Sequence, residues 1–95
     1  MILVRTVFHA HHGKINQLVE AFKQATHDAA DQPMILTDLS GRIDTMVLEG
    51  HHKSLGAYKQ WRASLFKSMR FQDGQTTMDR LIASGSIEFY TIEQA

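Results

Sequence analysis

The chain has 95 residues, 43% of them hydrophobic, and its ten basic and ten acidic residues give a formal net charge of zero. Such a balance argues against nucleic acid or an anionic membrane as a partner, because no long-range field gathers polyanions. The lack of cysteine excludes disulfides, thiolate nucleophiles and thiolate metal sites. We expect one domain, residues 1–95, with no signal peptide or membrane span, and therefore a cytoplasmic protein.

The first half of the chain predicts a strand, a helix and a hairpin. Residues 2–10, ILVRTVFHA, are rich in β-branched and aromatic side chains, and successive residues point to opposite faces, which is typical of a strand. Apolar residues then recur at helical spacing over 15–29, and Pro33 prevents this helix from continuing. The segment MILTDLSGRIDTMVLEG predicts two strands around Ser40 and Gly41, and both a two-residue and a three-residue turn fit.

The second half predicts two helices and a final strand. Ser54 suits the N-cap of a second helix, whose apolar stripe continues to Met69 before FQDG interrupts it. A short third helix is predicted to begin at Thr76 and to have Gly85 at its C′ position. Residues 86–93, SIEFYTIE, form the last strand.

This order of elements indicates an α+β, ferredoxin-like β-α-β-β-α-β fold. We expect a four-stranded antiparallel sheet of strand order 4-1-3-2, with both main helices on one face. Alternation divides the strands into a helix-facing set, Ile2, Val4, Phe8, Met46, Leu48, Ile87 and Phe89, and an opposite set, Leu3, Arg5, Val7, His9, His11, Val47, Glu49, His51, Glu88, Tyr90 and Ile92. Because the opposite set is half apolar, and burying each aliphatic side chain contributes about 1.5–3 kcal/mol, we predict a homodimer.

Three segments carry a resemblance to a known family. The first strand ending before HGK, the hairpin DLSGRIDTMVLEG and the tail SGSIEFYTIE resemble the dimeric α/β-barrel superfamily, in particular its NIPSNAP-like and antibiotic-biosynthesis-monooxygenase-like branches. The resemblance implies a homodimer in which two sheets pack by their bare faces into an α/β barrel, often with a small-molecule cleft.

Five of the six histidines lie at the ends of two strands, in HAHH at 9–12 and HH at 51–52. We expect the first and third strands to lie side by side in parallel, so that these ends meet, and alternation places His9, His11, His51 and Glu49 on one face. Three imidazoles and a carboxylate suit a divalent metal such as zinc, iron, manganese or nickel. The alternative is that the histidines are structural or line a pocket, and we favour this alternative over the metal site. No cofactor is otherwise expected.

The remaining candidates are ligand-binding residues on the strands and the second helix. Arg5, Glu49 and Glu88 form a charge network or anchor a polar group of a ligand, and we expect Arg5 to have a carboxylate partner. Tyr90 offers a hydroxyl to a pocket or to the interface. Trp61 lies on the helix stripe, where core packing is the favoured role.

Two functions fit these observations. The first is a monooxygenase-like enzyme in which His9 or His51, acting as a base, removes a proton from a small aromatic substrate before oxygen attacks the carbanion. Haem-degrading members of the superfamily resemble each other in using an asparagine, a tryptophan and a histidine. In this sequence the first strand has no asparagine, and Trp61 alone matches the helix position. The alternative is a non-catalytic dimeric module that binds a ligand or a metal, so the sequence leaves open whether the protein is an enzyme.

Overall fold

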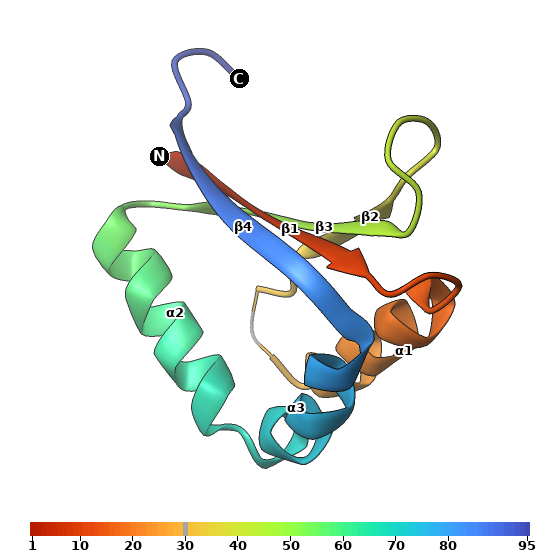
Figure 1. Ribbon diagram of the computed structural model, residues 1–95. Coiled ribbons are helices and arrows are strands. Elements are labelled where there is room, and N and C mark those ends of the chain that lie inside the picture. The colour runs from red at the N-terminus through yellow and green to blue at the C-terminus, as the bar shows by residue number, and fades with distance from the viewer. Residues whose placement is uncertain (30) are drawn as a thin grey trace.

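The computed structural model describes residues 1–29 and 31–95 and contains one four-stranded sheet with three helices on one side of it (Figure 1). In chain order the elements are β1 (Ile2–Ala10), α1 (Ile15–Ala25), β2 (Met34–Thr37), β3 (Thr45–His52), α2 (Leu55–Lys67), α3 (Met69–Leu81) and β4 (Ile82–Thr91). The strand order is β2-β3-β1-β4 and every neighbouring pair is antiparallel. The ferredoxin-like α+β fold is therefore confirmed, and no helix among the described residues is long and apolar enough to cross a membrane.

The alternation of the strands was predicted correctly. Even-numbered residues of β1 and β3 face the helices, where Val4 and Met46 are buried, and Met46 forms a core cluster with Leu18 and Phe22 of α1. Phe71, Met78 and Leu81 of α3 complete this core. The other side of the sheet, which we call the open face, carries Leu3, Arg5, Val7, His9, Met34, Leu36, Val47, Glu49, His51, Glu88 and Tyr90.

The prediction that the first and third strands run parallel is wrong. In the register of β1 and β3, Ile2 pairs with His52 and His9 pairs with Thr45. The connectivity explains this, because α1 returns the chain so that β2 runs in the direction of β1, and the hairpin then reverses β3. The two strand ends that carry histidines consequently lie at opposite ends of the sheet.

The hairpin has a longer loop than either predicted turn. Residues 38–44 connect β2 to β3, with Gly41 and Asp44 in the left-handed region at φ of 88° and 57°. The Asp38 carboxylate accepts a hydrogen bond from the Thr45 amide at 3.0 Å, and the Asp44 carboxylate accepts one from the Gly13 amide at 3.2 Å. These side-chain contacts hold a wide loop against the β1–α1 connection, so a tight turn does not form.

The third helix is longer than predicted, since it begins at Met69 and includes FQDG. Ser68 is its N-cap, with the hydroxyl accepting from the Phe71 amide at 3.1 Å. Burying Phe71 outweighs the cost of about 1 kcal/mol for Gly74 in a helix interior. Gly85 belongs to β4, where a Cβ would lie 3.1 Å from the Val7 carbonyl oxygen, and it is not a helix cap.

Candidate functional site

A cavity of about 670 Å³ lies between the helices and the helix-facing side of the sheet. Its floor includes Val4, Thr6 and Phe8 of β1, together with Leu48 of β3 and Ile87 of β4. The inner residues of α2 and α3 form its walls: Tyr58, Trp61, Arg62, Leu65, Phe66, Phe71, Gln75, Met78 and Asp79. A volume of this size, with mainly apolar walls and a few polar groups, is typical of a small-molecule site.

The rings of His52, Tyr58 and Trp61 line one wall of the cavity, and the Phe89 ring packs against Tyr58 outside the lining. His52, the last residue of β3, lies 5.3 Å from Tyr58 and 5.4 Å from Trp61, measured between ring centroids. Tyr58 also stacks on Trp61 at 6.1 Å and meets Phe89 edge-on at 5.5 Å. Residues 58 and 61 share one face of α2 by helical spacing, and β4 places Phe89 on the helix side of the sheet. This wall offers flat surfaces to a flat ligand.

The charge of Arg62 affects the pKa of Tyr58, one turn earlier on the same face of α2. Burial raises the pKa of the Tyr58 hydroxyl above its ordinary value, and the positive charge of Arg62 partly opposes this shift. The Arg62 guanidinium carbon lies 4.4 Å from the centroid of the Phe66 ring. The hydroxyl therefore stays protonated at neutral pH, and the guanidinium is held against the cavity wall.

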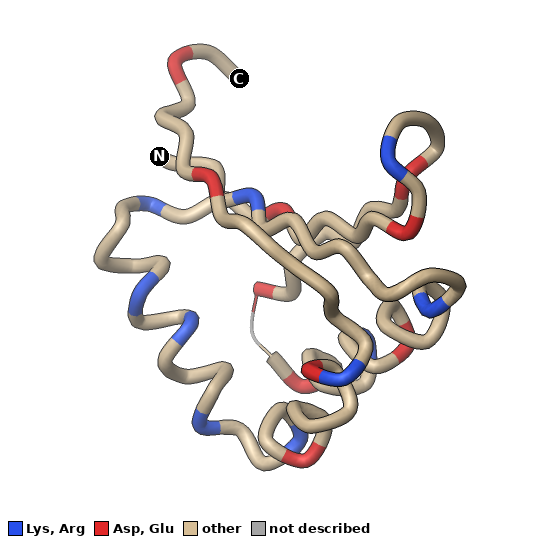
Figure 2. Tube along the Cα trace, in the orientation of Figure 1, with Lys and Arg blue, Asp and Glu red and all other residues tan. Residues whose placement is uncertain are grey.

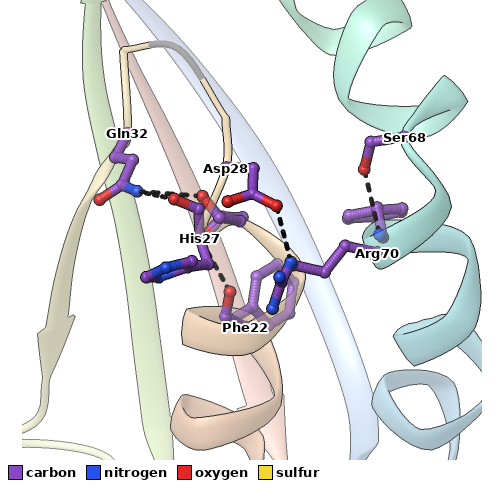
Figure 3. A network of polar contacts seen from close by, with 8 residues as sticks. Phe22, His27, Asp28, Gln32, Ser68 and Arg70 are labelled. Atoms are coloured by element: carbon purple, nitrogen blue, oxygen red, sulfur yellow. Dashed lines mark hydrogen bonds and ion pairs between the residues drawn. The ribbon is translucent and has the colours of Figure 1, made fainter.

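Polar contacts fix the end of the cavity formed by Phe22, Gln32 and Phe71 (Figure 3). The Gln32 side-chain amide donates to the carbonyls of His27 at 2.6 Å and Thr26 at 3.2 Å, and Arg70 of α3 pairs with Asp28 at 3.0 Å. These bonds tie the segment after α1 to the start of α3. The two helices thus hold a fixed frame around that end of the cavity.

The predicted histidine cluster does not assemble. His9 Nδ1 lies 3.1 Å from the Thr45 hydroxyl at one end of the β1–β3 pair, whereas His51 pairs with Leu3 near the other end. Six residues of strand separate these positions, which is about 20 Å at about 3.3 Å per residue. His11 lies beyond the end of β1, where its amide donates to the Leu81 carbonyl at 3.0 Å.

The same separation applies to the predicted metal set of His9, His11, His51 and Glu49. Across residues 1–29 and 31–95, no group of three or more histidine, cysteine, aspartate or glutamate side chains is placed to hold a metal ion. The prediction that these four residues converge is wrong, because it depended on parallel strands. His51, one of the two histidines predicted as a base, belongs to the cavity lining at the end of β3, although its register partner Leu3 and strand alternation place it on the open face.

The predicted ligand-binding residues divide between the two sides of the sheet. Trp61 lines the cavity, while Arg5, Glu49, Glu88 and Tyr90 lie on the open face. The predicted carboxylate partner of Arg5 is confirmed as Glu49, with Nε to Oε2 at 3.1 Å.

Tyr90 joins these charged residues on the open face. The Arg5 guanidinium carbon lies 5.6 Å from the centroid of the Tyr90 ring. A hydrogen bond with Glu88 raises the pKa of the Tyr90 hydroxyl, and the charge of Arg5 opposes the shift. Arg5, Glu49, Glu88 and Tyr90 therefore form a polar network on a partly apolar surface, which is separate from the cavity.

Sequence reasoning missed His52, Tyr58 and Arg62 as site residues. The signal for His52 was present, because alternation from Met46 and Leu48 places it on the helix-facing side. The signal for Arg62 was a charged residue within a stripe of α2 that contains Tyr58, Leu65 and Phe66.

Solved structures with the same fold include NIPSNAP proteins. An uncharacterised NIPSNAP domain protein from Burkholderia xenovorans superposes with a TM-score of 0.82 at 13% identity, covering 96% of this chain and 93% of that one. A NIPSNAP family protein from Agrobacterium tumefaciens gives a TM-score of 0.83 at 14% identity, over 95% and 90% of the two chains.

A proposed antibiotic biosynthesis monooxygenase from Nitrosomonas europaea is also similar, with a TM-score of 0.73 at 14% identity, over 99% of this chain and 100% of that one. Comparison with protein-family profiles and with curated proteins finds no match. The structural neighbours thus come from the two branches that the sequence resembles, and at these identities they establish the fold alone.

Proposed function

We propose that the protein binds a small, flat, apolar molecule in the cavity between α2 and the sheet. The observation that carries this proposal is the cavity of about 670 Å³ with His52, Tyr58 and Trp61 along one wall. Binding there buries a ligand against ring faces without displacing the core residues Leu18, Met46 and Leu81, which do not line the cavity. The kinship in fold with a proposed monooxygenase is consistent with an aromatic ligand.

The enzymatic form of the proposal is a monooxygenase-like oxidation with His52 as the base. The imidazole takes a proton from an acidic carbon of an electron-rich phenolic substrate, and the carbanion then reacts with O₂. A CH₂ group and O₂ give a carbonyl group and water, so no external reductant is consumed. His52 suits this role because it borders the cavity and because an imidazole is a common general base.

A non-catalytic ligand-binding module is the second candidate, and one observation favours it. A general base is usually oriented by a hydrogen-bonded partner, whereas His52 makes ring contacts with Tyr58 and Trp61 in the described part of the chain. Binding without turnover needs no such partner. The two candidates share the cavity and differ only in chemistry.

We also propose that the protein is a homodimer joined by its open faces. Met34 and Leu36 are exposed there, and Leu3, Val7 and Val47 lie between them and β4 in the sheet. A second copy placed on this surface would bury these aliphatic groups. The ligand cavity is on the other side of the sheet, so it stays available in such a dimer.

The fluorescence of Trp61 provides the test of binding. It is the only tryptophan in the chain and it lines the cavity, so its emission is transferred to N-phenyl-1-naphthylamine when that neutral probe enters. We expect saturable quenching with one probe per chain. Quenching that does not saturate, or that saturates equally in a variant whose cavity is filled, contradicts the proposal.

Turnover then separates the enzyme from the module. Oxidation of an anthrone-type phenol under air should be lost in His52→Ala and kept in His9→Ala, which serves as the matched control because His9 lies at the other end of the sheet. Unchanged turnover in His52→Ala contradicts the assignment of the base. Binding without oxygen consumption by the wild type supports the module.

A further inference from the structure

The basic character of α2 is the observation from which this inference starts. The helix carries Lys59, Arg62 and Lys67 and no acidic residue, although the whole chain has no net charge (Figure 2). Lys59 and Lys67 do not line the cavity, whereas Arg62 does. Arg62 is thus the one cation that this helix presents to the apolar site.

Arg62 interrupts an otherwise apolar inner stripe. Tyr58, Arg62 and Phe66 follow each other at intervals of four residues, and Leu65 lies beside them. The Arg62 side chain is exposed at the edge of the cavity, so its charge stays solvated in the free protein and is accessible to a ligand that enters. The guanidinium carbon lies 4.4 Å from the centroid of the Phe66 ring, and this cation–π contact does not use the N–H donors in a hydrogen bond.

Arg62 has a cation–π contact and no ion pair in residues 1–29 and 31–95, where each pair within 4.0 Å involves another basic side chain. Asp31 and Asp79 also line the cavity, on the segment after α1 and on α3. His51 and His52 border it from β3. The two carboxylates repel an anionic ligand, so an acidic group of the ligand is favoured only beside Arg62, on the α2 side of the cavity.

We infer that Arg62 is the anchor for an acidic group and that the ligand is a flat apolar molecule carrying one carboxylate or sulfonate. This inference rests on the proposed function and adds the chemical class of the ligand. The planar guanidinium donates two parallel hydrogen bonds to the two oxygens of such a group. The apolar part then lies against Trp61 and Tyr58.

Two fluorescent probes test this inference because they differ by one charge. 1-Anilinonaphthalene-8-sulfonate is N-phenyl-1-naphthylamine with an added sulfonate, and energy transfer from Trp61 reports both in the same cavity. In the wild type we expect the anionic probe to bind about five- to tenfold more tightly than the neutral one, as a partly exposed charge-assisted pair implies. Arg62→Gln should remove this preference and change the affinity for the neutral probe by less than about twofold.

Lys59→Gln is the matched control, because it removes the same charge from the same helix outside the cavity. It should leave the preference within about twofold of the wild type. A wild type that binds both probes equally, or an equal loss of preference in Lys59→Gln and Arg62→Gln, overturns the inference while leaving the cavity proposal intact. Failure of the neutral probe to bind at all instead contradicts the proposed function.

A carboxylate and its neutral amide extend the test from a sulfonate to a carboxylate ligand. 2-Naphthoate should displace the neutral probe at a lower concentration than 2-naphthamide from the wild type, and the two should become equal in Arg62→Gln. Arg62→Lys should recover only part of the difference, because lysine keeps the charge but lacks the planar pair of donors. Equal displacement from the wild type overturns the inference.

Discussion

The ion pair between Arg5 and Glu49 gives a quantitative test of the proposed dimer. The two side chains are 40% and 22% exposed in the single chain and their charged atoms are 3.1 Å apart. At this exposure the pair contributes about 0.2–1 kcal/mol to folding, because solvent screens it. If a second copy covers the open face, the same pair is desolvated, and removing one partner then costs about 3–5 kcal/mol because Arg5 is left buried without a counter-charge.

Glu49→Gln should therefore act on association far more than on folding. A symmetric dimer contains the pair twice, and a loss of even about 3 kcal/mol raises the dissociation constant about a hundredfold. Sedimentation equilibrium measures this constant, and urea unfolding at low protein concentration measures the small effect on the single chain. Glu20→Gln is the control, since Glu20 pairs with Lys23 on the exposed side of α1 at 3.7 Å. A dissociation constant for Glu49→Gln within about threefold of that for Glu20→Gln would refute this reasoning.

Three further substitutions test the cavity, the aromatic wall and the third helix. Ile87→Trp should weaken the affinity for N-phenyl-1-naphthylamine at least about tenfold while lowering the free energy of unfolding by less than about 1 kcal/mol, because Ile87 is 43% exposed and lines the cavity; unchanged affinity in a titration calorimeter would contradict this. Burial raises the pKa of Tyr58 in the folded state, so folding free energy should be lost as pH rises above the ordinary tyrosine value, and Tyr58→Phe should reduce that loss; identical slopes of the urea-derived free energy between pH 8 and about pH 10.5 would show the reasoning to be wrong. Ser68→Ala should cost about 0.5–2 kcal/mol because it removes the cap of α3, whereas Ser40→Ala in the exposed hairpin loop should have no measurable effect on thermal unfolding.

The sequence identified the two faces of the sheet because alternation is a local property. Val4 and Met46 face the helices and Arg5 and Glu49 face away, as expected from a period of two along each strand. The carboxylate partner of Arg5 was expected because an unpaired charge on a covered face is costly, and the structure supplies it as Glu49, the register partner of Arg5.

Strand direction is a property of the whole connectivity, and there the sequence reasoning failed. His9 and His51 were placed together by assuming a parallel pair, and one reversed strand separates them. The extent of α3 failed for a related reason, because Gly74 is a local signal for a break whereas the burial of Phe71 is a tertiary effect.

The cavity could not be predicted from the sequence because its volume depends on how far α2 stands from the sheet. The stripe of Tyr58, Trp61 and Leu65 indicates only that this side of the helix avoids water. A stripe packed directly on the strands and a stripe lining a cavity have the same pattern. Arg62 and His52 can be identified as site residues only after the cavity that they line is known.

The central claim is that the ligand lies on the helix side of the sheet, and methyl NMR tests it most directly. Titration with N-phenyl-1-naphthylamine should shift the methyl resonances of Leu48, Leu65 and Ile82, which line the cavity, and leave those of Leu3, Leu36 and Val47 on the open face in place. Shifts confined to Leu3, Leu36 and Val47 would contradict the claim, because they would place the ligand on the opposite side of the sheet.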